Sequence, residues 1–203
     1  MMVGSQQKRH SGAAGRGALR PGGRTERVRM AVATTVLGFI QNGLIDFSVQ
    51  DVANSAGVSR STLYARWPTR EALITEALTV HSLEFQFEPG ANWEETLRNL
   101  VYSFRDFSLR PTEIAINSFA AFSKGGFISQ ETGRIWSCLT NDAAEYLEKA
   151  KTEGLIRPEV DPKSVVTSIL SSISGLVVIG KIEPDDEMME NMIDIYINGC
   201  SSK

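Results

Sequence analysis

Apolar positions near the start of the chain follow the spacing of a helix rather than that of a strand. Beginning at Thr25, apolar side chains recur every three or four residues, and Val32, Val36 and Phe39 fall on one face. Gly43 follows the last of these turns, where a glycine supplies the left-handed backbone of a helix C-cap. The pattern predicts a first helix that begins at Thr25 and ends just before Gly43.

Three shorter helices are predicted next, each opened by a hydroxyl side chain. Ser48 stands three positions before Asp51, which is the spacing of a capping box, and Gly57 ends the helix that follows. Pro68 stops the next helix, because proline disfavours helical geometry in the residue before it. The predicted ranges are 49–56, 60–67 and 70–83, and the opening hydroxyl residues are Ser48, Ser59 and Thr69.

The rest of the chain reads as long amphipathic helices. Beyond residue 92, no stretch alternates apolar and polar residues over a length that would favour a strand. The expected helices are 93–108, 112–123, 127–153, 162–181 and 185–198. The sequence therefore predicts an all-α protein with a small head (residues 24–84) and a larger helical body (residues 85–203).

Charge is distributed unevenly along the chain. Residues 1–70 contain ten Lys or Arg against three Asp or Glu, although the net charge of the whole chain is −3. Residues 1–23 are rich in glycine and basic residues and nearly empty of large apolar side chains, which predicts a disordered basic arm. A basic head on an acidic body favours a polyanion as the partner of the head, while charge alone also fits a solvated tail without a partner.

Composition excludes several other classes of protein. With 203 residues, 42% of them hydrophobic, the chain is long enough to bury a core. Cys138 and Cys200 stand far apart, which indicates neither a disulfide framework nor a thiolate zinc site, and His10 and His81 are isolated from each other and from both cysteines. We therefore expect a reducing cytoplasm, no metal and no cofactor. His81 is expected to be only a polar position late in a helix.

Two apolar runs bear on secretion and membranes. Residues 30–40 resemble the core of a signal peptide, but they contain two threonines and a glycine and lead to no cleavage site between small residues. The run ISGLVVIG at residues 173–180 is far shorter than the roughly 20 residues that a membrane-spanning helix needs. A soluble, cytoplasmic protein with no membrane partner is expected.

The segment GVSRSTLYARWPTREAL, residues 57–73, concentrates hydroxyl, aromatic and arginine side chains. Two short helices joined by a tight turn form a helix-turn-helix, whose second helix enters the DNA major groove. Leu63 is needed for the core, which leaves Arg60, Ser61 and Tyr64 on the outward face. Arginine reads guanine there, and hydroxyl groups donate to phosphate oxygens.

This segment resembles the DNA-binding domain of the tetracycline-repressor (TetR) family of bacterial transcriptional regulators. The resemblance is carried by FSVQDVANSAGVSRSTLYARWPTREALI at residues 47–74, with Gly43 ahead of it. Leu44 replaces the family's common aromatic residue and Arg70 its usual lysine, and both keep the physical role of the residue they replace. The predicted DNA-binding residues are Ser48, Ser59, Arg60, Ser61, Thr62, Tyr64, Arg66, Trp67, Thr69, Arg70 and Arg24.

Several of these residues have a second interpretation. Tyr64 is either a phosphate contact or a partly buried packing aromatic, and Trp67 either wedges between two helices or also offers its indole N–H to a phosphate. Thr62 either contacts DNA or bonds the helix backbone. The basic segment from Arg16 to Arg29 either follows the duplex into the minor groove or stays in solvent as a nonspecific tail.

For the body, the resemblance implies a ligand-binding and dimerisation domain, and a repressor that a small, largely apolar effector releases from a palindromic operator. Dimerisation also follows from the short recognition helix, because a two-fold pair reads half-sites about 34–36 Å apart. The predicted ligand-binding residues are Phe104, Phe107, Asn117, Phe119, Phe122 and Trp136. The predicted dimer-interface residues are Ile169, Ile173, Leu176, Met189, Met192, Ile193 and Tyr196.

Plainer alternatives stand beside these assignments. Aromatic side chains at helical spacing usually belong to a core, and the apolar stripes of the last two helices can face their own protomer. An enzyme would need a nucleophile with a base, paired carboxylates, a phosphate loop or metal ligands, and none stands at a meaningful spacing. Two alternatives remain. One is a protein-interaction module, and the other is a DNA-binding protein whose body responds to another protein or to no partner.

Overall fold

The computed structural model describes residues 23–123 and 125–202, and within these ranges the chain forms nine α-helices and one short π-helical turn. The head contains α1 (Arg24–Gln41), α2 (Val49–Ala56), α3 (Arg60–Arg66) and α4 (Arg70–Ser82). The body contains α5 (Trp93–Ser108), α6 (Pro111–Phe122), α7 (Phe127–Thr152), α8 (Pro162–Ser174), the π-helical turn η1 (Gly175–Ile179) and α9 (Asp186–Cys200). The predicted all-α class and order of helices are confirmed, whereas the predicted arm, apart from Gly23, lies outside the described residues.

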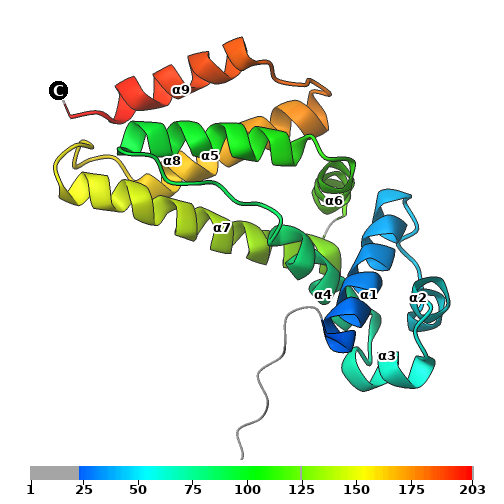
Figure 1. The fold of residues 1–203 in the computed structure, drawn as a ribbon. Helices are drawn as coiled ribbons and strands as arrows, with labels where there is room; N and C mark the ends of the chain where they lie inside the picture. Colours follow the sequence, from blue (N-terminus) through cyan, green and yellow to red (C-terminus); the bar gives the residue numbers. More distant parts are fainter. Residues whose placement is uncertain (1–22, 124, 203) are drawn as a thin grey trace, which may run out of the picture.

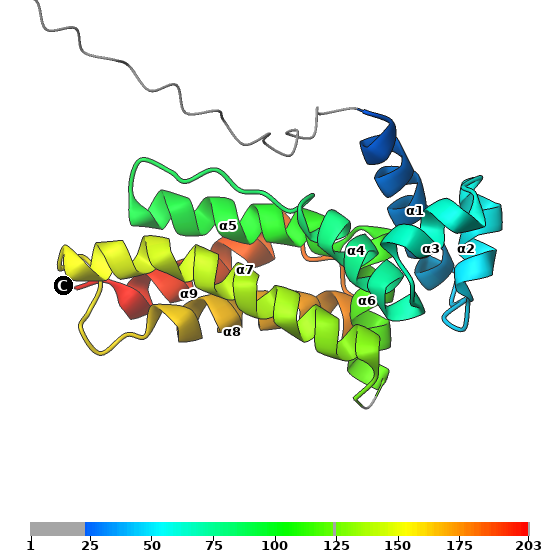
Figure 2. The same cartoon turned by 90° about the horizontal axis from the view of Figure 1, so that it is seen from below.

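The head lies at one end of an elongated molecule. Helices α1, α2 and α3 are grouped there, far from the C-terminus (Figure 1), and α5, α7, α8 and α9 run beside one another through the body (Figure 2). Helix α4 packs along α1 and also contacts α7, while α6 packs against both α1 and α7. Helices α4 and α6 therefore connect the head to the body.

Side-chain caps stabilise the starts of the predicted helices α2, α3 and α4. The Ser48 hydroxyl accepts from the backbone N–H of Asp51 at 3.2 Å, and the Asp51 carboxylate accepts from the Ser48 backbone N–H at 2.8 Å, which completes the predicted capping box. Gly57 ends α2 with a φ of 64°, a left-handed conformation that favours glycine. Ser59 and Thr69 cap α3 and α4 by accepting the backbone N–H three residues ahead.

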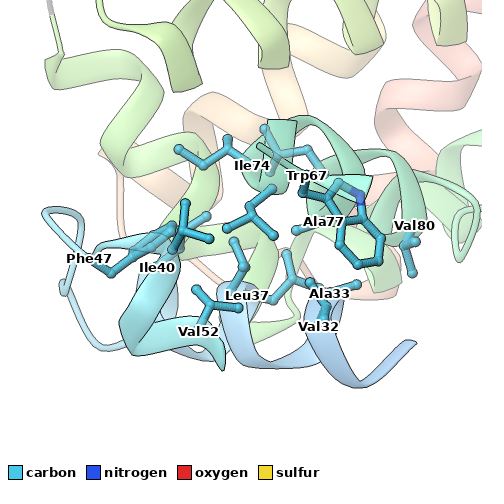
Figure 3. Close-up of a cluster of buried hydrophobic side chains, with 14 of the residues drawn as sticks. Val32, Ala33, Leu37, Ile40, Phe47, Val52, Trp67, Ile74, Ala77 and Val80 are labelled. Carbon is cyan, nitrogen blue, oxygen red and sulfur yellow. The ribbon is translucent and has the colours of Figure 1, made fainter. Parts of the chain in front are cut away.

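One cluster of apolar side chains closes the head. Figure 3 shows Val32, Leu37, Val52, Trp67 and Ile74 converging from the helices of the head, and each is at most 9% exposed. Full burial of such a side chain stabilises the fold by about 1.5–3 kcal/mol. Two residues of the body belong to the same cluster: Ile116 of α6 and Ile128 of α7. The body therefore completes the core of the head.

One helical stretch of the described chain, Pro162–Ile179, is long and apolar enough to cross a membrane by length and composition. This helical stretch includes most of the apolar run at residues 173–180 and begins eleven residues before it, so it is longer than that run. The core helix of a soluble protein meets the same criterion, and this stretch packs against α5 and α7 with 44% of its residues buried. Its composition is accounted for by its place in the core of the body.

Candidate nucleic-acid interface and ligand cavity

The outer surface of α3 carries the candidate base contacts. Leu63 is fully buried, whereas Arg60 and Ser61 are exposed and Tyr64 is 49% exposed. This placement is the one the sequence predicted for these three side chains. Ala65 is exposed one helical turn beyond Ser61 and was missed, because alanine carries no polar signal, yet a methyl group there suits the C5-methyl group of thymine.

The hydroxyl groups at the start of α2 and α3 also serve the fold. The Ser48 hydroxyl bonds the Asp51 carboxylate at 2.7 Å, and these bonds from Ser48 hold the pKa of the Asp51 carboxyl below its usual value. Ser59 Oγ lies 2.8 Å from Thr62 Oγ1, so the Thr62 hydroxyl bonds the capping side chain instead of a helix carbonyl. The two hydroxyl residues within α3, Ser61 and Thr62, remain exposed at the outer surface.

The structure corrects the DNA-contact prediction for Trp67. Its side chain is 5% exposed within the cluster of Figure 3, and its indole N–H donates to Glu76 Oε2 at 3.1 Å. The other oxygen of that carboxylate accepts from Arg29 Nε at 2.5 Å. The indole is thus committed to an inward hydrogen bond, which fits the wedge interpretation and leaves no N–H for a phosphate.

Arg70 also turns inward, contrary to the expectation of a phosphate-directed cation. Its guanidinium group donates to the carbonyl oxygen of Ile45 and lies 5.2 Å from the ring centre of Phe47. These contacts hold the loop between α1 and α2 against the start of α4. Arg70 is therefore a structural cation, whereas the cap residue Thr69 remains exposed.

Arg66 brings the basic start of α1 beside the end of α3. Its guanidinium lies 5.2 Å from the ring centre of Trp67 and donates to the carbonyl oxygen of Thr25 at 3.3 Å. The predicted contact Arg24 and the neighbouring Arg27, which the sequence analysis did not single out, are both exposed on this first part of α1. The start of α1, with its two exposed arginines, is therefore tied to the end of α3 through Arg66.

A cavity of about 340 Å³ lies where α4, α5, α6 and α7 meet. Most of its lining is apolar, as expected for a small-molecule site. Phe104, Phe107 and Trp136 line it, as predicted, whereas the lining residues His81, Glu113 and Thr132 were not predicted. His81 and Glu113 gave no local signal because each is the other's partner from far away along the chain.

His81 corrects the expectation of an ordinary polar position. It is 4% exposed, and its Nε2 lies 2.9 Å from Oε2 of Glu113, which is itself 6% exposed. Asn117 Nδ2 donates to the other carboxyl oxygen of Glu113 at 2.6 Å, and the ring of Phe107 stacks on the imidazole with 5.0 Å between centres. A buried polar cluster therefore joins α4 to α6 at the cavity wall.

A second hollow of about 390 Å³ lies between α6, α7 and the end of α8. The predicted residue Asn117 lines this hollow rather than the first cavity, and Trp136 and Thr132 border both. The other two predicted residues line neither hollow: Phe119 packs against the head cluster, and Phe122 is 80% exposed at the end of α6. Helical spacing placed them correctly on α6 but not on the face that lines a cavity.

The predicted dimer interface is partly corrected. Four of its residues are fully buried in the core of their own protomer and offer no surface to a second copy: Ile169, Ile173, Met189 and Ile193. The other three keep partial exposure: Leu176, Met192 and Tyr196. Ile179 of η1, at the end of the predicted stripe, is 74% exposed, and Ile195 of α9, which was missed, is 71% exposed.

Among the described residues, no group of three or more His, Cys, Asp or Glu side chains is placed to hold a metal ion. Cys138 is exposed and Cys200 is buried, and neither forms a disulfide. Burial raises the pKa of the Cys200 thiol, which keeps the thiol form.

Comparison with known proteins agrees with the geometry of the head. Residues 32–77 match the family described as bacterial regulatory proteins, tetR family. An HTH-type transcriptional regulator of Mycobacterium tuberculosis strain H37Rv is 25% identical over 146 residues, which cover 71% of this chain and 75% of that protein.

Solved structures share the whole fold. The flavonoid-responsive regulator FrrA matches with a TM-score of 0.70 at 22% identity, over 88% of this chain and 99% of that chain. A TetR-family regulator from Rhodococcus sp. gives 0.68 at 20% identity, over 87% and 100% of the two chains. The fatty acid degradation regulator FadR from Bacillus halodurans gives 0.65 at 14% identity, over 87% and 99%.

The fold and the helix-turn-helix together define a DNA-binding transcription regulator, and the related proteins are regulators rather than enzymes. Residues 32–77 carry the DNA-binding segment described for the tetR family of bacterial regulatory proteins, as the residues at 47–74 predict.

Proposed function

We propose that this protein is a cytoplasmic, ligand-responsive repressor without enzymatic activity, cofactor or membrane partner. It binds a palindromic operator as a homodimer through α3, and a small, largely apolar effector in the cavity lowers its affinity for DNA. The observation that carries this proposal is the position of α4, which belongs both to the head core and to the cavity wall.

Helix α4 presents different residues to the two sites. Leu73, Ile74 and Ala77 are buried in the head cluster, while His81 at the other end of the helix lines the cavity, and Leu78 belongs to both. A ligand that prefers a different position of this helix shifts the population of head orientations by its differential affinity for the two states. The sign of the response, release from DNA, follows the family resemblance.

Names of two structural neighbours support an apolar effector. FrrA is named for its response to flavonoids, and FadR is named for the regulation of fatty acid degradation. Both names connect regulators of this fold with largely apolar compounds, which suits a cavity lined mainly by aromatic and aliphatic side chains.

The DNA-binding part of the proposal predicts a palindrome. Selection from random duplex DNA with the full-length protein is expected to enrich two inverted half-sites, because a two-fold dimer reads each half with one α3. In anisotropy titrations on the winning sequence, Tyr64→Ala is expected to weaken binding by roughly 1 kcal/mol or more. Failure to enrich any sequence, with weak binding at every salt concentration, would favour the interaction-module alternative.

The dimer part of the proposal predicts a surface on α9. Ile195 is 71% exposed, and the exposed Met188 and the partly exposed Met192 share its face of the helix, while small residues such as Ser172 on α8 permit close approach. Ile195→Arg is expected to raise the dimer dissociation constant at least tenfold, about 1.4 kcal/mol, because it buries an unpaired charge in the interface.

Light scattering across a dilution series measures this effect. Asp194→Arg is the matched control, because it places the same side chain on the exposed polar face of the same helix. An unchanged dimer in Ile195→Arg would move the interface elsewhere, and a monomeric wild type at all concentrations would refute the dimer.

A further inference from the structure

The polar groups of the cavity wall form a selective set. His81 and Glu113 are more than nine-tenths buried. The Glu113 carboxyl has two hydrogen-bond partners, His81 and Asn117. A carboxylate offers about four lone-pair sites, so two acceptor sites remain for a further donor. Because Glu113 lines the cavity, a bound molecule that carries an O–H or N–H group is the donor that this site lacks.

The charge of the wall disfavours an anion. His81 and Glu113 form a buried hydrogen-bonded pair at the wall, and the Glu84 carboxylate, 3.6 Å from His81 Nδ1, is itself paired with Arg110. Arg134 lines the cavity but forms an ion pair with Glu131, and the lining also includes Asp142. A bound carboxylate would lose its hydration without gaining an uncommitted cation, which is costly.

Thr132 supplies the complementary polar group. Its side chain is 8% exposed, it lines the cavity, and its Oγ1 is buried without a hydrogen-bond partner in the described structure. Buried hydroxyl groups are usually paired, so an unpaired hydroxyl on a residue that lines the cavity is a donor that a ligand oxygen would satisfy.

The apolar part of the lining favours a flat aromatic body. Phe104 and Trp136 meet edge to face with 6.0 Å between ring centres, and Phe85 meets Phe107 in the same way at 5.5 Å. Aromatic rings pack on such edges and faces with more stabilisation than their buried area alone supplies. The cavity therefore combines an aromatic lining with one acceptor and one donor.

We propose that the effector of this cavity is an uncharged, hydroxylated aromatic compound that donates a hydrogen bond to Glu113 and accepts one from Thr132. Aromatic carboxylates of the same size are rejected by the charge of the wall. This inference rests on the proposed function, since it takes the cavity as the effector site, and it adds the chemical class of the ligand and the two residues that select it.

Calorimetric titration of the full-length protein with 2-naphthol and with 2-naphthoate tests the proposal, because the two probes share a ring system and differ in charge. The wild type is expected to bind 2-naphthol at least tenfold more tightly than 2-naphthoate. Glu113→Gln removes the negative charge while keeping the shape of the side chain, and it is expected to narrow this ratio, mainly through tighter binding of 2-naphthoate.

Thr132→Val is expected to weaken 2-naphthol binding about tenfold without lowering the melting temperature, because the hydroxyl has no partner to lose in the free protein. Thr140→Val is the matched control: Thr140 is also buried on α7 but does not line either hollow, so 2-naphthol affinity should not change. The unchanged melting temperature separates ligand recognition from a structural role of Thr132.

The outcomes separate this inference from the proposed function. If 2-naphthoate binds as tightly as 2-naphthol and either probe weakens DNA binding, the cavity is an effector site but the proposed ligand class is wrong. If neither probe binds the wild type, the ligand class is again overturned, and the cavity loses its support as the effector site. DNA recognition by α3 is then judged separately, by the selection of operator sequences.

Discussion

Trp67→Ala is expected to destabilise the protein by about 3–5 kcal/mol, the usual cost of deleting a buried large aromatic side chain. Trp67 is 5% exposed, and its ring fills the junction of the head helices in Figure 3. The substitution also removes the indole donor from Glu76 and leaves this partly buried carboxylate with Arg29 as its remaining partner. Urea unfolding followed by circular dichroism measures the loss.

Trp67→Phe separates the packing of this residue from its hydrogen bond. Phenylalanine keeps most of the apolar volume and loses the donor to Glu76, so we expect a smaller loss, on the order of 1 kcal/mol. Folded Trp67→Phe is expected to bind DNA as the wild type does, because the indole N–H points inward. If it folds normally and binds DNA tenfold more weakly, the indole contacts a phosphate, and the assignment of its N–H to an inward hydrogen bond is wrong.

Tyr64→Ala is the matching control in the same segment. Tyr64 is 49% exposed, so its removal should change stability by about 0.5 kcal/mol or less, the range typical of surface substitutions, while it weakens DNA binding. The two aromatic residues of this short segment should therefore show opposite patterns in unfolding and binding measurements.

The parts of the fold that the sequence predicted well depend on neighbours along the chain. A capping box involves Ser48 and Asp51, three residues apart, and a C-cap involves one glycine, Gly57, so both are visible in a short window. The outward face of α3 is likewise local, because placing Leu63 in the core fixes the direction of every other side chain on that helix.

The features that the sequence did not predict depend on residues far apart in the chain. His81 and Glu113 are 32 positions apart and meet only because the fold brings α4 and α6 to the same cavity, and the pair of Arg29 and Glu76 spans 47 positions. Neither pair follows a periodic or motif spacing. Isolated in the sequence, His81 had no visible partner, although the structure makes it a buried member of the cavity wall.

The dimer prediction shows a different limit of helical patterns. An apolar stripe indicates that a helix face is covered, but it does not say whether the same protomer or a second copy covers it. On α9 the stripe that includes Met189 and Ile193 faces the core of the protomer. The exposed Ile195 lies on the opposite side of α9, where it shares a short face with Met188 and Met192 among polar residues, so this face gives little signal in a window average.

Arg60→Ala is expected to weaken binding to the selected operator by about 1–3 kcal/mol and to relax the base preference at one position of each half-site. Arg60 is exposed at the first position of α3, where its guanidinium is free to present a planar pair of donors to guanine. Anisotropy titrations against the operator and against variants at each position measure both effects.

Arg60→Lys distinguishes a base contact from a phosphate contact. Lysine keeps the charge but not the two-pronged geometry, so it should lose base preference while the dependence of affinity on salt stays near that of the wild type. If Arg60 contacted only a phosphate, Arg60→Lys would bind nearly as the wild type does, and Arg60→Ala would weaken all sequences equally and lower the salt slope by about one. Lys149→Ala, which removes an exposed cation on α7 far from α3, controls for the loss of charge alone. A base preference that survives in Arg60→Ala would transfer sequence reading from Arg60 to other exposed side chains of that surface, Ser61, Tyr64 and Ala65.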